Sequence, residues 1–129
     1  MTSRFASRHL LLIASLLGAT GVLAGAFGAH ALKTLVTPER LGTWATAAHY
    51  QQVHAVTLLV LAAWSHAVGR LVAPTAAICL TAGTVVFSGS LYTLVLTDLR
   101  VFGAVTPLGG LLLVTGWTLL ARAGANART

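Results

Sequence analysis

The sequence contains very little charge. Only 8% of its 129 residues are Asp, Glu, Lys or Arg, whereas a soluble domain usually has about a quarter. A small soluble protein with so few charged groups would have too little polar surface to stay in solution. Hydrophobic residues make up 57% of the chain, which suits a lipid environment. We therefore predict a single integral membrane domain, residues 1–129.

Cysteine is almost absent, and basic residues are never clustered. Cys79 stands alone, so no disulfide can form within the chain and no cysteine-based zinc cluster can be built. Nucleic-acid binding needs a stripe or patch of Lys and Arg, so we expect no nucleic-acid partner. Basic residues scattered singly between apolar blocks are typical of helix ends at a membrane surface. They are Arg4, Arg8, Lys33, Arg40, Arg70, Arg100, Arg122 and Arg128.

The sequence also lacks the residue patterns that catalysis needs. No pair of carboxylates is placed to share acid and base roles, and the serines at 88 and 90 are not in a nucleophile-elbow context. His49 and His54 are five residues apart and point in different directions on a helix. We expect no enzyme activity, no cofactor and no metal. Haem or metal ligation by histidines on facing helices is a minor alternative.

Four long stretches without a formal charge are present. Each can hold the roughly 20 apolar residues that a helix needs to cross a bilayer, and they do not alternate as barrel strands do. Pro38, Pro74 and Pro107 fall at or near the expected helix starts, where the missing N–H of proline does no harm. The sequence predicts an all-α, four-helix transmembrane bundle. Its helices are expected near residues 10–32, 49–68, 74–97 and 106–121.

The first apolar stretch and the distribution of basic residues determine the expected orientation in the membrane. A signal peptide is the rival for the first stretch, but the uncharged run continues to Leu32, longer than the usual core of roughly 7–15 residues. We expect the helix to be retained. The termini and the connection between the second and third helices then share one side. That side holds five of the eight basic residues, so both termini are expected in the cytoplasm.

Residues 33–48 form the longest expected connection. Pro38 and the residues that follow it could form a short amphipathic helix, with Trp44 at the depth of the lipid headgroups. An ordinary ordered loop is an equal alternative.

Small and polar residues recur at helical spacing. Small residues on one stripe of the first helix predict close packing against another helix, in this chain or in a second copy. Hydroxyl groups are unfavourable in lipid, so the polar faces of the second and third helices should turn inward. The stripe consists of Ala14, Gly18, Gly21, Gly25 and Gly28; the polar faces consist of Tyr50, His54 and Thr57, and of Thr81, Thr84, Ser88 and Tyr92.

Two sequence elements resemble a known family. They are Gly-Ala-Phe-Gly-Ala-His-Ala-Leu at 25–32 and Gly-Thr-Val-Val-Phe-Ser-Gly-Ser-Leu-Tyr at 83–92. They are similar to the YgdD/YwdK-type family of small bacterial membrane proteins, a domain of unknown function. Further matches are Tyr50-Gln51 with His54, Thr106-Pro107 with Gly109-Gly110, and Gly116-Trp117. The resemblance implies a multi-pass protein of the bacterial inner (plasma) membrane and no established activity.

These elements converge toward the outer face in the expected topology. Intramembrane ionisable residues are by default a functional-site hypothesis, although they could simply satisfy each other's hydrogen bonds. We predict a non-catalytic module that binds a lipid, a small hydrophobic ligand or a partner membrane protein, including another copy of itself. The alternative is a small oligomeric transporter or channel. The candidate polar vestibule comprises His30, Tyr50, His54, Ser88, Ser90, Tyr92 and Thr106.

Overall fold

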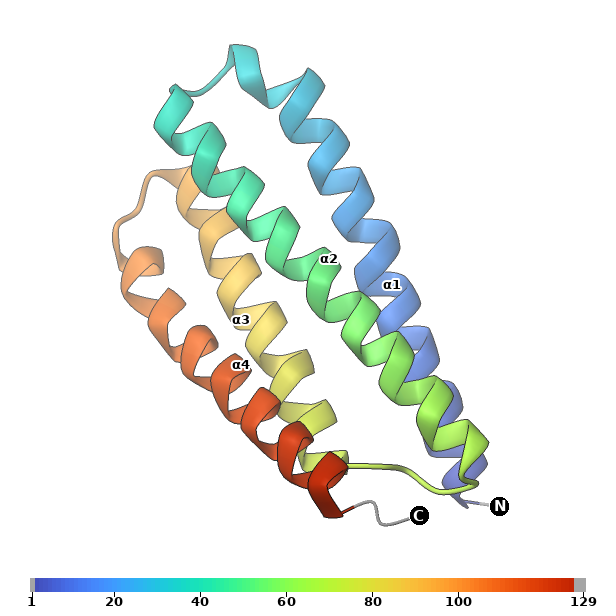
Figure 1. Ribbon diagram of the computed structural model, residues 1–129. Helices are drawn as coiled ribbons and strands as arrows, with labels where there is room; N and C mark the ends of the chain where they lie inside the picture. The colour runs from blue at the N-terminus through green and yellow to red at the C-terminus, as the bar shows by residue number, and fades with distance from the viewer. Residues whose placement is uncertain (1, 127–129) are drawn as a thin grey trace.

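The computed structural model describes residues 2–126, with the side chains of residues 7–126. Four long helices run antiparallel to their neighbours, and both termini lie at the same end (Figure 1). The described residues contain no strand, so the predicted all-α bundle is confirmed. The elements are α1 (Thr2–His30), a single 3₁₀ turn η1 (Leu32–Thr34), α2 (Pro38–Ala67), α3 (Pro74–Thr97) and α4 (Val101–Asn126).

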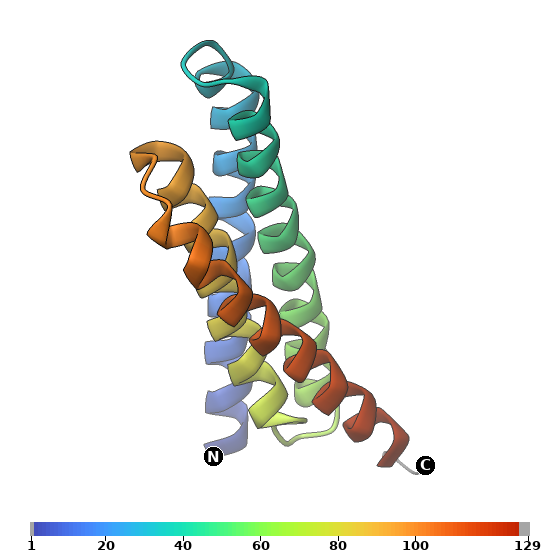
Figure 2. The same cartoon turned by 90° about the vertical axis from the view of Figure 1, so that its left-hand side faces the viewer.

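The bundle consists of two hairpins joined through α2 and α3. Extensive helix contacts link α1 with α2, α2 with α3, and α3 with α4. The α1–α2 hairpin reaches beyond the α3–α4 hairpin at one end, and α4 crosses the bundle obliquely (Figure 2). We call this the loop end, because it carries η1 and the connection at 98–100. The opposite end, with both termini and the connection at 68–73, is the terminal end.

The second helix begins at Pro38 rather than near His49, so residues 38–48 form neither a separate helix nor a loop. Its start has strong local signals. The Thr37 side chain accepts a hydrogen bond from the backbone N–H of Arg40 at 3.4 Å, and Pro38 occupies the first turn. Such a cap and proline favour a helix start at this point, and the helix then continues without a break into its apolar half.

The fourth helix also begins earlier than expected, at Val101, so that Pro107 lies inside it. Proline in a helix interior removes one backbone hydrogen bond. Membrane helices tolerate this because nearby hydroxyl groups and neighbouring helices satisfy the freed backbone groups. The carbonyl that loses its helical donor at Pro107 is that of Gly103, and the hydroxyl of Thr106 donates to the adjacent backbone oxygen of Phe102 at 3.1 Å. The third helix has the predicted bounds, whereas α1 extends from Thr2 to His30.

The small-residue stripe of α1 packs against α2 of the same chain. Of the two expected partners, a helix of this chain or of a second copy, the structure shows the first. A Cβ atom at Gly28 would lie 2.6 Å from the ring of Trp44, and one at Gly21 would lie 3.0 Å from Gln52. The same device joins α3 and α4, since a Cβ at Gly109 would lie 2.4 Å from the backbone nitrogen of Phe87. Absence of a side chain at these positions therefore sets the separation of the helices.

Three helices are long and apolar enough to cross a membrane: Ser7–Thr34, which includes α1 and η1, then α3 and α4. The α2 helix is equally long but carries charged and polar residues in its first half. Its Gln51 and His54 side chains are nonetheless buried, with exposed fractions of 7% and 4%. Since a buried polar side chain in lipid needs a partner, the contacts of α2 define the interior of this multi-pass membrane protein.

Candidate functional site

Gln51 of α2 connects three helices near the middle of the bundle. Its Nε2 donates to the backbone oxygen of Leu17 at 2.9 Å and to Oγ1 of Thr20 at 2.7 Å, both on α1. Its Oε1 accepts from the hydroxyl of Tyr92 on α3 at 2.8 Å. The amide thus uses its donor and acceptor groups together. Sequence reasoning noted Gln51 only within the family resemblance and did not include it among the site residues.

Trp44 lies next to this amide, inside the bundle. Its indole Nε1 donates to the backbone oxygen of Ala24 at 2.7 Å, and its ring centroid is 4.5 Å from that of Tyr92 and 5.5 Å from that of Phe27. Only 7% of Trp44 is exposed. The sequence predicted Trp44 at the depth of the headgroups; the structure shows that its ring turns toward α1, where Gly28 leaves room for it.

His54 uses one ring nitrogen within α2 and the other to link α2 to α4. Nδ1 lies 2.7 Å from the backbone oxygen of Tyr50, and Nε2 accepts from the indole N–H of Trp117 at 3.1 Å. A carbonyl oxygen can only accept, so these two contacts require the neutral tautomer with its hydrogen on Nδ1. Trp117 was matched in the family resemblance but was not predicted as a site residue, since only the folded chain brings α4 beside His54.

The remaining vestibule residues also have partners close by. Ser88 donates to the backbone oxygen of Ala47 at 2.8 Å. Ser90 and Thr106 share a hydrogen bond of 2.8 Å between their hydroxyl oxygens. The ring of Tyr50 lies 4.6 Å from that of Phe87.

One of the seven predicted vestibule residues stands apart. His30 is exposed at the last position of α1. No hydrogen bond or ring contact joins it to the other six within the described residues 7–126. The other six vestibule residues therefore contact neighbouring helices or their own helix, whereas His30 does not contribute to helix packing. The predicted inward orientation of polar groups is confirmed for Ser88 and Tyr92, which donate across helices.

Arg40 closes the loop end. Its Nη2 donates to the backbone oxygen of Val95 near the end of α3, and its Nη1 lies 3.9 Å from Oδ1 of Asp98. Asp98 adopts a left-handed backbone conformation with φ of 60° as it ends α3. The guanidinium thus joins the first turn of α2 to the last turn of α3 by hydrogen bonding and opposite charge.

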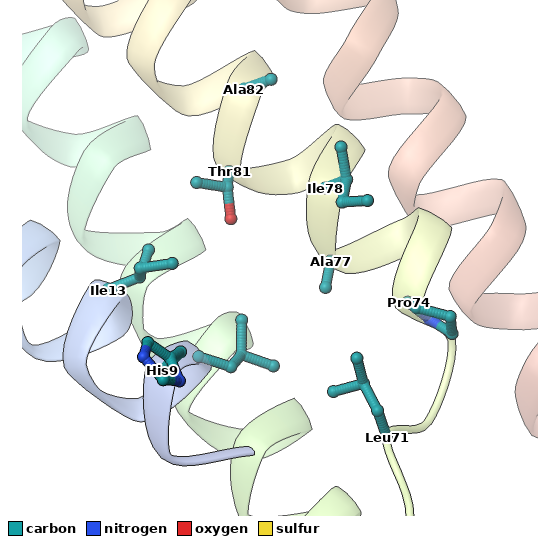
Figure 3. A pocket seen from close by; sticks show the side chains of 9 residues that line it. His9, Ile13, Leu71, Pro74, Ala77, Ile78, Thr81 and Ala82 are labelled. Atoms are coloured by element: carbon teal, nitrogen blue, oxygen red, sulfur yellow. The ribbon is translucent and has the colours of Figure 1, made fainter. Parts of the chain in front are cut away.

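The terminal end contains an apolar groove between α1 and α3. Its volume is about 420 Å³. Ile13 and Ile78 are 37% and 67% exposed, so the groove opens on the outer surface of the bundle. Both α1 and α3 pack on α2, and small side chains on α3 leave this space between them. The lining residues are His9, Leu10, Ile13, Leu71, Pro74, Ala77, Ile78, Thr81 and Ala82 (Figure 3).

Sequence reasoning did not find the α1–α3 groove. The available signal was the small side chains of Pro74, Ala77 and Ala82 along one side of α3. Chemically the groove offers almost only carbon atoms, with polar atoms from His9 and Thr81 (Figure 3). Such a surface can hold a hydrocarbon chain by shape and dispersion contacts, and it lacks the converging polar groups that would orient a polar substrate.

Comparison with known proteins gives relatives along most of the chain. A family described as "Protein of unknown function (DUF423)" matches residues 24–110. The UPF0382 inner membrane protein YgdD of Escherichia coli K12 is 38% identical over 120 residues, covering 93% of this chain and 88% of that protein. A UPF0382 membrane protein of Staphylococcus haemolyticus is 38% identical over 110 residues, covering 85% and 89% respectively. No solved structure matches significantly.

Proposed function

The chain belongs to the DUF423 family of proteins of unknown function, and we propose that it is a non-catalytic membrane module that holds a lipid acyl chain in the α1–α3 groove. The observation that supports this proposal is the groove itself. Its volume of about 420 Å³ lies within the roughly 300–1,000 Å³ that ligand cavities usually have. Its walls belong to two helices that are apolar enough to cross a membrane, so hydrocarbon is the medium in contact with it.

The hydrogen bonds inside the bundle support binding over the alternative of transport. A pathway for a polar solute needs polar groups that are free to bind the solute. The amide of Gln51 and the imidazole of His54 are instead engaged with neighbouring helices. The topology expected from the sequence puts five of the eight basic residues on the side of the termini, so we place the terminal end, and therefore the groove, at the cytoplasmic side of a bacterial inner membrane.

Photo-crosslinking tests the proposal. The full chain is reconstituted in phosphatidylcholine vesicles that contain a phosphatidylcholine with a diazirine in one acyl chain. We expect labelling to concentrate on the residues of α1 and α3 that line the groove: Leu10, Ile13, Ala77, Ile78, Thr81 and Ala82. Ala82→Trp should fill the groove and remove most of this labelling.

Val85→Trp is the matched control. Val85 lies one turn further along α3, is 57% exposed, and does not line the groove. We expect this variant to label like the unmodified protein. Uniform labelling of all outward-facing positions, or equal labelling of the Ala82→Trp and unmodified proteins, would show that the groove holds no chain in preference to the surrounding lipid.

A further inference from the structure

A second cavity at the terminal end lies between α1 and α2 and carries basic groups. Its volume is about 280 Å³. Its apolar wall combines Leu11 of α1 with Leu59, Ala62 and Ala63 of α2, and Ser7, Arg8 and His66 complete the lining. We call it the basic pocket. Arg8 and His66 are exposed, whereas Ala62 is buried at 3%, so the pocket has a cationic rim above an apolar floor.

No acidic side chain lies beside this rim within the described residues 7–126. Glu39 and Asp98 are the only acidic residues of the sequence, and both lie at the loop end, in the first turn of α2 and directly after α3. Arg8 has no hydrogen bond or ion pair within the described residues 7–126. A guanidinium at the edge of a low-dielectric region is poorly solvated and gains from an anionic partner.

Three of the last carbonyl groups of α2 accept hydrogen bonds from the turn that follows the helix. The backbone N–H groups of Val68, Gly69 and Arg70 donate to the oxygens of Trp64, His66 and Ser65 respectively. Gly69 has φ of 67°, as expected where a helix ends in a left-handed turn. Because these carbonyl oxygens already accept hydrogen bonds within the chain, the charge of Arg8 is available to an external anion.

We infer that the basic pocket binds an anionic phospholipid. The planar fork of Arg8 suits bidentate hydrogen bonding to a phosphate, and His66 offers one N–H in either neutral tautomer. An acyl chain of the same lipid would lie along Leu11 and Leu59. This site is separate from the α1–α3 groove, because it uses a different face of α1 and requires a charged headgroup.

Native mass spectrometry of the full chain tests the inference by competition between phosphatidylglycerol and phosphatidylcholine with identical acyl chains. We expect the unmodified protein to retain phosphatidylglycerol preferentially. Arg8→Gln should lower this preference about fivefold, the effect of one basic residue on an anionic lipid surface. Arg122→Gln is the matched control, because Arg122 is exposed near the end of α4 and lines neither cavity. It should leave the preference unchanged.

Filling the pocket provides a second variant that does not depend on charge. Ala63 is exposed and lines the pocket, so Ala63→Trp should fold normally, as checked by circular dichroism, and lose the bound phosphatidylglycerol. It should keep the crosslinks in the α1–α3 groove, which makes the two sites independently testable. Equal retention of the two lipids by the unmodified protein, or an equal loss for Arg122→Gln and Arg8→Gln, would overturn the inference.

Discussion

The loop end and the terminal end of this bundle are built by different interactions. From the loop end to the middle of the bundle, Arg40, Trp44 and Gln51 connect α2 to its neighbours through hydrogen bonds. At the terminal end, the helices meet through apolar side chains such as Leu10, Leu58 and Leu80 and leave the two cavities between them. Lipid tails are as apolar as leucine, so apolar contact alone gives little drive for helices to close together. Close association therefore occurs where hydrogen bonds and glycines are present.

The largest expected effect comes from closing the space between α3 and α4. Gly109→Ala places a Cβ 2.4 Å from the backbone nitrogen of Phe87, and backbone cannot move aside as a flexible side chain can. We expect a loss of about 3 kcal/mol in unfolding free energy, measured by denaturant titration in detergent. Gly89→Ala is the control, because nothing lies within 4 Å of its Cβ; it should be neutral or stabilising. Similar losses for both variants would mean that helix separation is not set at Gly109.

Removing the central amide should have the next largest effect. Gln51→Leu deletes hydrogen bonds to Leu17 and Thr20 and leaves the hydroxyl of Tyr92 without its acceptor. We expect a loss of about 2 kcal/mol, since each membrane hydrogen bond contributes about 0.6 kcal/mol and an unpaired buried group costs more. The same titration applied to Gln52→Leu gives the control. Gln52 has no hydrogen bond within the described residues, so equal losses would contradict the role given to Gln51.

The link between His54 and Trp117 should contribute less. A double-mutant cycle with His54→Ala and Trp117→Phe isolates the contact of 3.1 Å between Nε2 and the indole N–H. We expect a coupling free energy of about 0.6 kcal/mol, the average for hydrogen bonds between membrane helices. Strictly additive effects of the two substitutions would show that the contact does not join α2 to α4.

The smallest expected effect lies at the terminal end. Ala82→Trp enters an existing groove and should change the unfolding free energy by no more than about 0.5 kcal/mol, as for most surface substitutions. Ala47→Trp is the counterpart at a fully buried position between α2 and α3, where exposure is 0%. Overpacking there should cost about 2 kcal/mol. If the two substitutions were equally tolerated, the contrast between the open α1–α3 groove and the closed contact of α2 with α3 would fail.

Much of the fold could be predicted because it depends on local patterns. Four uncharged stretches indicated four helices, and Pro74 marked the start of α3 at the correct residue. The start of α2 was missed because the helix was expected to begin where the polar residues give way to apolar ones. The capping residue Thr37 and the following Pro38 nevertheless marked the true start in the sequence. For Pro107, the preference of proline for the first turn was outweighed by the tolerance of membrane helices for an internal proline, and α4 begins at Val101.

The candidate site was predictable only in its residue types. Helical spacing showed that Ser88 and Tyr92 belong to one inward face, and the structure places their partners on α2. Spacing within one helix carries no information on which residue of another helix lies opposite, so Gln51 and Trp117 were missed as partners. The two cavities were missed for the same reason, since they depend on how the helices diverge.

The sequence by itself determined that this chain is a helical membrane protein with a small-residue stripe and one end poorer in basic charge, because composition and helical periodicity are properties of neighbouring residues. The tertiary structure decided that the stripe packs on α2, that Trp44 turns inward, and that α1 and α3 leave an open groove. These outcomes depend on the register and separation of whole helices, which arise from contacts between residues far apart in the chain. The position of the α1–α3 groove thus follows from where close packing between helices stops.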